Sequence, residues 1–410
     1  MSFNTALSGL RAASSNLSVT GNNIANASTT GFKQSRTEFG DVYANSILGT
    51  GARTPGSGVL VNAISQQFSQ GNISITNNSL DLAVNGSGFF ILSNQGSPSY
   101  TRNGTFGLDN QGFITASNGA RLQGFAASPS GQILSGALSD VRIQTSDIAP
   151  NASSEVNMRF NLDSGDALPA VGTFDTADPN SYNWSTAATI YDSLGNSHVL
   201  TSYYVRGTPV APATDTPWTV YTDLDSSGVA HNIGTLTFDS NGALTAPASA
   251  SLNDSWVPSG GAATLPFTMD FAGSTQFGSE STVTSLDQDG YAPGRLSGVR
   301  IDDTGVVFAN YTNGQALVLG QVALANFANP QGLAPVGNTA WNETFSSGQP
   351  VVGAPQTGSR GALQSGALED SNVDLSSELV NLILAQRDYQ ANAKTIETSN
   401  AVTQTIVNLR

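Results

Sequence analysis

The sequence predicts an α+β fold in which two terminal helices pair as a coiled coil and mainly antiparallel β domains lie between them. Apolar residues recur at heptad spacing near the N-terminus, which is typical of a helix that packs along one narrow stripe. From Asp374 to the C-terminus the chain contains no Gly or Pro, as expected of a long helix. Between these ends, short alternating segments are separated by Gly or Asn-Gly turns, a pattern typical of antiparallel strands.

The N-terminal helix is expected within residues 1–28. One heptad position is occupied by Phe3, Leu10, Leu17 and Ile24, and the position three residues later by Ala6, Ala13, Thr20 and Ala27. Gly21 and the Asn-rich residues around it are expected to weaken the helix beyond about residue 20. Ordering about 25 residues costs at least as much free energy as burying a handful of apolar side chains provides. This segment is therefore either a disordered tail or a helix that folds on self-assembly, and the strong C-terminal helix favours the second interpretation.

The C-terminal helix is predicted to begin at Asp374, a good N-cap residue. One heptad position is occupied by Leu375, Leu382, Tyr389, Ile396 and Thr403, and the position four residues later by Leu379, Gln386, Ala393, Asn400 and Val407. Acidic residues are expected at the positive end of the helix dipole, namely Glu369, Asp370, Asp374 and Glu378, with Lys394 and Arg410 further along. The candidate residues for helix packing and polymerisation are Phe3, Leu7, Leu10, Leu17, Ile24, Leu375, Leu379, Leu382, Tyr389 and Ile396.

The interior is predicted to be a set of nested, discontinuous β domains. Because the two terminal helices have complementary stripes, we expect them to pair, so that the chain runs out along one side and returns along the other in an elongated arrangement. The expected parts are a terminal coiled-coil domain (1–28 and 366–410), a connecting segment (29–70 and 357–365), an inner β domain (71–146 and 285–356) and an acidic outer β domain (147–284).

Composition and charge exclude several classes of protein. The chain has no cysteine, which excludes disulfides, thiolate chemistry and Cys-ligated metals. Of the formal net charge of −15, most falls in residues 147–290, which contain 16 acidic and two basic side chains. Such an acidic block argues against binding to nucleic acid. No apolar run is long enough to cross a bilayer and the N-terminus lacks a signal-peptide pattern, so we expect neither membrane insertion nor a cleavable secretory signal.

Catalytic, cofactor-binding and metal-binding motifs are not found, so we expect a protein that is not an enzyme and needs no cofactor. The sequence contains no nucleophile elbow, no HExxH and no phosphate-binding glycine loop. Residues 223–228 resemble a calcium loop, but EF-hand spacing would require an acid at Gly234, so we interpret them as a hairpin turn, as we do 286–290. Asp302 and Asp303 are likewise expected at a hairpin turn, and His198 is expected to be structural.

The two ends of the chain resemble the signatures of bacterial flagellar axial proteins of the rod and hook. The N-terminal resemblance lies in "SGLRAASSNLSVTGNNIANASTTGFK", in which Asn22, Asn23, Ala25, Asn26, Gly31 and Phe32 match the family motif. The C-terminal resemblance covers "ALEDSNVDLSSELVNLILAQRDYQANAKTIETSNAVTQTIVNLR". Interior stretches are similar to hook proteins in particular, among them "LDLAVNGSGFFIL", "YTRNGTFGLDNQGF" and "DGYAPGRLSGVRIDDTGVV".

The resemblance implies a structural, motility-related subunit that self-assembles into a flexible helical tube. Such a tube acts as a universal joint that transmits torque from the motor's rod to the filament. The implied partners are other copies of the chain, the rod, the hook cap, the hook-filament junction proteins and the flagellar type III export apparatus. The implied location is extracellular, in the hook and basal body of the flagellum.

Two alternatives remain at this stage. The first is a distal rod or other axial protein, although these lack a large mid-chain insertion such as residues 147–284. The second is a secreted β-rich adhesin or binding module, which would present ligand-contacting aromatics drawn from Trp184, Trp218, Trp256 and Trp341. The role of the Gly-rich stretch 46–60 is left open.

Overall fold

The computed structural model describes residues 2–42, 56–129, 131–144, 146–209 and 215–408. These residues divide into two compact units. Unit 1 comprises Met1–Thr145, Gly298–Asn310 and Ala316–Arg410, and unit 2 comprises Ser146–Ser297 and Tyr311–Gln315. The predicted outer domain ended at residue 284, whereas unit 2 continues to Ser297. Most of the stretch 46–60 lies outside the described residues.

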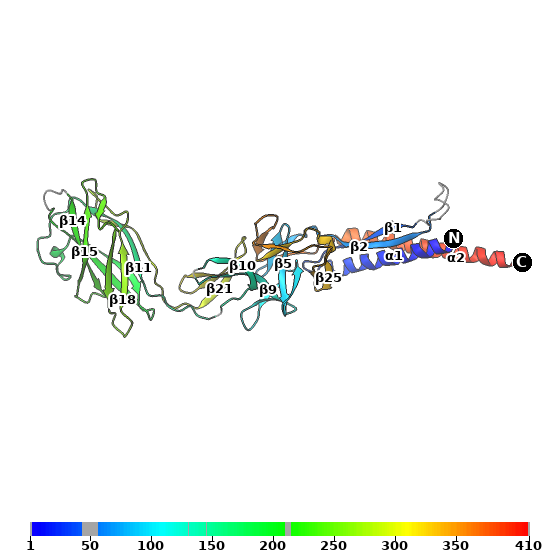
Figure 1. The fold of residues 1–410 in the computed structure, drawn as a ribbon, viewed down its shortest axis with the longest axis horizontal. Helices are drawn as coiled ribbons and strands as arrows, with labels where there is room; N and C mark the ends of the chain where they lie inside the picture. The colour runs from blue at the N-terminus through cyan, green and yellow to red at the C-terminus, as the bar shows by residue number, and fades with distance from the viewer. Residues whose placement is uncertain (1, 43–55, 130, 145, 210–214, 409–410) are drawn as a thin grey trace. The chain divides into compact units, whose positions relative to one another are not determined.

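Unit 1 contains both terminal helices, α1 (Ser2–Ala25) and α2 (Leu375–Asn408), which lie side by side (Figure 1). They are antiparallel, because Asn23 near the end of α1 bonds to Glu378 near the start of α2. The predicted weakening of α1 beyond residue 20 is wrong, since the helix continues through Gly21 to Ala25. The reason is tertiary: the buried Asn23 side chain accepts a bond from Ser35 N (2.9 Å) and donates one to Ser35 O (2.8 Å).

The start of α2 agrees with the prediction in one respect and differs in another. Asp374 caps the helix, because its Oδ1 accepts a hydrogen bond from Ser377 N at 2.9 Å. Glu369 was expected to face the helix dipole, and this is wrong. It lies in strand β29, before the helix, with its side chain fully buried.

The β structure of unit 1 includes a hairpin that sequence reasoning assigned to a connecting segment. Strands β1 (Ser35–Asp41) and β2 (Val59–Gln66) pair antiparallel, and both pack against α1 (Figure 1). Two short pairs, β3 (Ile73–Ile75) with β29 (Ala367–Glu369) and β4 (Leu82–Asn85) with β28 (Ala362–Ser365), join the outgoing and returning chain.

The main sheet of unit 1 has the strand order β21-β22-β23-β9-β5-β6-β26-β25, with β7, β8, β10, β24 and β27 attached beside it. Its strands are β5 (Phe89–Asn94), β6 (Ser97–Thr101), β7 (Phe106–Leu108), β8 (Ile114–Ala116), β9 (Arg121–Ala127), β10 (Ile133–Asp140), β21 (Leu296–Ile301), β22 (Val306–Tyr311), β23 (Ala316–Val322), β24 (Leu324–Asn326), β25 (Ala334–Gly337), β26 (Ala340–Asn342) and β27 (Val351–Gly353). An aromatic core that includes Phe89, Tyr100, Phe327 and Trp341 packs against it, mainly through edge-to-face contacts. A short 3₁₀ helix, η2 (Pro330–Gly332), precedes β25.

Unit 2 is a sandwich of two β sheets. One sheet runs β12-β13-β14-β15-β16, and the other runs β17-β18-β11-β19 with β20 also on β11. Their strands are β11 (Glu155–Asp163), β12 (Trp184–Tyr191), β13 (Ser197–Arg206), β14 (Thr216–Leu224), β15 (His231–Phe238), β16 (Leu244–Ala246), β17 (Ser251–Trp256), β18 (Leu265–Asp270), β19 (Thr275–Phe277) and β20 (Thr282–Gln288), with η1 (Pro179–Ser181) in the loop before β12. Both sheets contribute to one buried core, for example Phe160, Tyr204, Trp218 and Phe267.

Two of the three predicted acidic turns are confirmed. Asp223 accepts bonds from Ser227 N and Gly228 N between β14 and β15, and Asp302 accepts bonds from Thr304 N and Val306 N between β21 and β22. Asp289 is not in a hairpin, because β20 pairs with β11. Its carboxylate instead accepts bonds from the backbone N–H groups of Ser154 and Glu155, at the start of β11.

Candidate functional site

Small residues line the contact between α1 and α2. Ala6, Ala13 and Thr20 of α1 are buried, as is Ala385 of α2. Gly9 lies so close to α2 that a Cβ atom on it would come within 2.4 Å of Asn392 Oδ1. The heptad row of small residues, Ala6, Ala13 and Thr20, therefore faces α2, and their small side chains allow the two helix backbones to approach closely.

The large candidate residues for helix packing lie beside this inner row. Leu7, Leu10, Leu17, Ile24, Leu382 and Ile396 are partly buried, whereas Phe3, Leu375, Leu379 and Tyr389 are exposed. In α2 the buried residue of this contact is Ala385, which lies three residues after Leu382, whereas the second heptad row noted in the sequence lies four residues after it. In that second row, Leu379, Gln386, Asn400 and Val407 are exposed, whereas Ala393 is partly buried.

An exposed apolar surface covers the first three turns of α2. Leu375, Leu379, Val380, Ile383 and Leu384 have exposed fractions of 48, 45, 57, 51 and 51%. We call these five residues the α2 apolar surface. Sequence reasoning listed Leu375 and Leu379 but missed the other three, although the run "LVNLIL" was a signal for a helix that is apolar on more than one face.

The family-motif residues lie where α1 ends and the chain enters the β structure. Gly31 requires its small size, because its φ is +68° and a Cβ atom would come within 2.5 Å of Asn103 N. Its N–H donates to Glu369 O at 2.7 Å. Asn22 accepts a bond from the Asn26 side chain at 2.8 Å, Ala25 ends α1, and Phe32 lines a neighbouring pocket.

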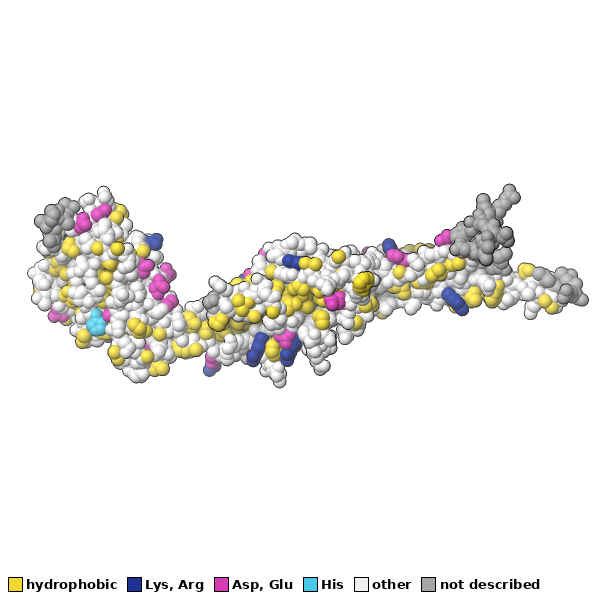
Figure 2. Space-filling view, in the orientation of Figure 1, with side chains coloured by type: hydrophobic (Ala, Val, Ile, Leu, Met, Phe, Trp, Pro, Cys, Tyr) yellow, Lys and Arg dark blue, Asp and Glu magenta, His cyan; other side chains and the backbone are white. Residues whose placement is uncertain are grey.

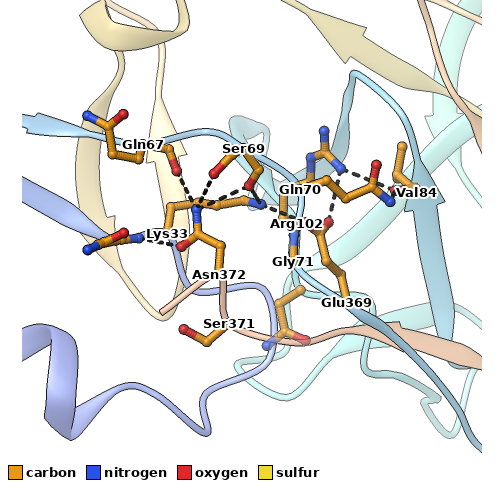
Figure 3. Close-up of polar contacts among 12 residues, drawn as sticks. Lys33, Gln67, Ser69, Gln70, Gly71, Val84, Arg102, Glu369, Ser371 and Asn372 are labelled. Carbon is orange, nitrogen blue, oxygen red and sulfur yellow. Dashed lines mark hydrogen bonds and ion pairs between the residues drawn. The ribbon is translucent and has the colours of Figure 1, made fainter. Parts of the chain in front are cut away.

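A buried ion cluster lies beside this motif (Figure 3). Lys33 Nζ is 2.6 Å from Glu369 Oε1, and Arg102 Nη1 is 3.0 Å from Glu369 Oε2. Lys33 also donates to Ser69 O at 2.7 Å, Arg102 to Gly86 O at 2.7 Å, and Gly71 N to Glu369 Oε1 at 2.9 Å. Burial lowers the pKa of Lys33, and the nearby Glu369 carboxylate opposes that shift. We call Lys33, Arg102 and Glu369 the junction triad; sequence reasoning assigned it no role.

Two further polar side chains bind the start of α2 to the same region. Asn372 accepts a bond from Gln34 N at 2.7 Å and donates to Gln67 O at 2.7 Å (Figure 3). Glu378, 2% exposed, accepts a bond from the Gln34 side chain at 2.6 Å. The junction thus connects residues near 30, 70, 100 and 370 and sets the position of both helices on the β structure of unit 1.

His198 of unit 2 lies between two carboxylates. Its Nδ1 is 2.6 Å from Asp225 Oδ2 and its Nε2 is 3.3 Å from Asp192 Oδ2. Burial opposes a charge on the imidazole, but the bonds to Asp225 and Asp192 outweigh it and raise the pKa of His198. His198 is 6% exposed, Asp192 begins the turn before β13 and Asp225 lies within the turn after β14, so we interpret this contact as structural.

Other site types find little support. Trp218, Trp256 and Trp341 are buried and Trp184 is partly buried against the core of unit 2, so none of the four is an exposed aromatic residue. Among the described residues, no group of three or more His, Asp or Glu side chains is arranged to hold a metal ion. Neither α1 nor α2, as far as the structure describes them, has the length and apolar character needed to cross a membrane.

Comparisons with known proteins agree with this architecture. Family models match residues 3–33 (flagella basal body rod protein), 83–157 (flagellar hook protein FlgE/F/G D1 domain), 161–291 (flagellar basal body protein FlaE D2 domain) and 364–409 (flagellar basal body rod FlgEFG protein C-terminal). The chain is 39% identical over 416 residues to the flagellar hook protein FlgE of Escherichia coli K12, with all of both chains covered. It is 33% identical to FlgE of Borreliella burgdorferi, covering 100% of this chain and 99% of that one.

A solved structure has a similar fold. The crystal structure of Helicobacter pylori flagellar hook protein FlgE2 matches with a TM-score of 0.56 at 15% sequence identity, covering 72% of this chain and 100% of that chain. Identity of 39% over the full length, including the helices, the junction and both β units, shows the family of the chain. The chain belongs to the flagellar hook protein FlgE family.

Proposed function

We propose that this chain is the structural subunit of a flagellar hook, and that it self-assembles into a flexible helical tube that transmits torque from rod to filament as a universal joint. The observation that carries the proposal is full-length identity to FlgE proteins. It is not an enzyme. Its partners are further copies of itself, the rod, the hook cap, the hook-filament junction proteins and the flagellar type III export apparatus, and it works outside the cell.

The α2 apolar surface supports the self-assembly part of this proposal. Five large apolar side chains on three turns of one helix remain exposed in the single chain. Such a surface is unfavourable in water and marks a contact with another macromolecule. Because α1 and α2 bind each other through small residues, the large residues beside them, including Phe3 and Tyr389, remain available for neighbouring helices in the polymer.

The charge distribution supports a solvent-facing role for unit 2. Acidic side chains are scattered over its visible surface (Figure 2), and residues 147–290 contain 16 acidic side chains against two basic ones. Like charges on such a surface repel and keep assembled tubes apart. The distal-rod alternative is disfavoured because the middle of the chain forms a complete sandwich, and the FlaE D2 family model matches most of it, residues 161–291.

The test compares two charge substitutions at exposed valines. Val380→Asp places a carboxylate in the α2 apolar surface, and Val257→Asp places one on unit 2, where Val257 is 73% exposed. We expect both purified subunits to unfold like the wild type, since neither side chain is in a core. Only Val380→Asp should fail to form tubes in electron micrographs. Normal tubes from Val380→Asp would contradict the proposal for this surface, and absence of tubes from the wild-type chain would contradict self-assembly itself.

A further inference from the structure

Phe345 is a fully exposed aromatic residue at the tip of a turn in unit 1. Its exposed fraction is 104%, whereas the next most exposed large apolar residue among those described, Ile75, is at 82%. A single exposed apolar residue needs no explanation by itself. Two further observations indicate that Phe345 contacts a partner. The backbone of its turn is held by hydrogen bonds, and the same unit carries a pocket of matching chemistry.

The turn that carries Phe345 is held from both sides. Thr344 N donates to Ser347 Oγ at 2.9 Å, and Ser347 is completely buried. Asn329 Nδ2 donates to Ser346 O at 3.0 Å. Gly332 packs so closely that a Cβ atom on it would come within 2.5 Å of the Ser346 carbonyl carbon. A side chain that projects from so constrained a backbone loses little conformational entropy on binding.

A pocket of about 790 Å³ lies on the same unit, between the end of α1, strand β2 and the β25–β26 hairpin. Residues that line it include Asn26, Phe32, Ile64, Ser117, Leu333 and Trp341. Trp341 is fixed there by edge-to-face contacts with Phe68 and Phe89 and by a bond from its Nε1 to the Gln66 side chain. The pocket is therefore largely formed before anything enters it.

The chemistry of the pocket selects an uncharged, aromatic-tipped segment. Its lining has apolar side chains and neutral amides and hydroxyls, and its one charged side chain, Lys33, is already paired with Glu369 and Ser69. A charged group would gain no partner there and would lose its hydration. The turn around Phe345 has the matching character, because Thr344 and Ser346 on either side of the ring are neutral and polar.

We propose that Phe345 of one subunit inserts into this pocket on a second copy of the chain. The contact rests on the proposed self-assembly and adds to it a site separate from the α2 apolar surface. In the proposed helical assembly this contact is head-to-tail, so each joined pair leaves one unused Phe345 and one unused pocket. A head-to-tail contact of this kind propagates along a helical assembly and does not stop at a dimer.

The test uses engineered cysteines, since the chain has none of its own. The double variant Ser117→Cys/Ser346→Cys places one thiol at the exposed Ser117 of the pocket and the other at the exposed Ser346, beside the inserted ring, which stays intact. After assembly and oxidation, we expect a ladder of cross-linked multimers on a non-reducing denaturing gel that disappears on reduction. The control Ser117→Cys/Ile75→Cys and each single variant should remain monomeric. Assembled tubes of the double variant without a ladder, a monomer closed by an internal disulfide, or an equal ladder from the control would overturn the proposal.

A second variant tests the energetic role of the ring. Phe345→Ser should unfold like the wild type but raise the critical concentration for assembly by about tenfold or more, the effect expected from burying one Phe side chain. Ile75→Ser should leave the critical concentration unchanged. An unchanged value for Phe345→Ser would contradict the insertion. Tubes that form without this contact would leave the proposed function intact, whereas a wild-type chain that never polymerises would overturn the proposed function.

Discussion

Lys33 and Glu369 are 336 residues apart in the sequence, yet Lys33 Nζ lies 2.6 Å from Glu369 Oε1 and both side chains are completely buried. With Arg102 they join the first residues after α1 to the last strand before α2. The junction triad is therefore one of the contacts that hold the helices on the β structure of unit 1.

Removing the carboxylate of the triad should destabilise unit 1. Glu369→Gln leaves Lys33 and Arg102 buried without a counter-charge, and breaking such a buried pair costs about 3–5 kcal/mol. The measurement is the free energy of unfolding of unit 1 by urea denaturation. As a control, Glu397→Gln breaks the exposed pair of Lys394 with Glu397 and should leave unfolding unchanged. Equal stability of both variants would show that the triad contributes nothing.

Unit 2 should lose stability as the pH rises through the pKa of folded His198. The pKa of His198 is raised by its bonds to Asp225 and Asp192, so the protonated ring stabilises the fold fully below the unfolded pKa of about 6.5 and loses that contribution at higher pH. Thermal unfolding of unit 2 between pH 5 and 9 measures this. His198→Gln should flatten the dependence over that interval. A wild-type profile that is itself flat, or that rises with pH, would refute the assignment.

Two glycines near the end of α1 should respond oppositely to alanine. Gly21 is helical and a Cβ atom on it would meet nothing within 4 Å, so Gly21→Ala should stabilise α1 by about 0.5–1 kcal/mol. Gly31 has a positive φ and faces the backbone of Asn103, so Gly31→Ala should destabilise unit 1 by at least about 1–2 kcal/mol. Denaturant midpoints of the two variants provide the comparison, and shifts in the same direction would argue against this account.

Assembly should protect the terminal helices more than the β units. Most of α2 is exposed in the single chain, and its inner contact consists of small side chains that bury little apolar area. Hydrogen exchange should therefore be fast for residues 2–25 and 375–408 in the soluble subunit and slow after polymerisation. The buried strands of unit 2 serve as the internal reference and should change little. Full protection of both helices in a proven monomer would contradict this expectation.

Local features of the sequence were sufficient for the two helices, for the mainly antiparallel interior and for several turns, but not for the β1–β2 hairpin. The heptad rows predicted α1 and α2, Asp374 predicted the N-cap, and Asp223 and Asp302 predicted turns, because each of these depends on residues only a few positions apart. The family was predicted from motifs distributed along the whole chain, since each motif is a local sequence pattern that does not depend on which surfaces contact one another.

Only the tertiary structure decided which faces of those elements are used. In the folded chain the row of Ala6, Ala13 and Thr20 faces α2, while Val380 and Ile383 remain exposed. The bonds between Asn23 and Ser35 hold α1 helical beyond Gly21, and Lys33 pairs with Glu369. Each of these outcomes depends on a partner between 12 and more than 300 residues away in the sequence. Periodicity identifies a stripe on a helix but carries no information about the surface that will cover it, because burial and ion pairing are properties of two segments together.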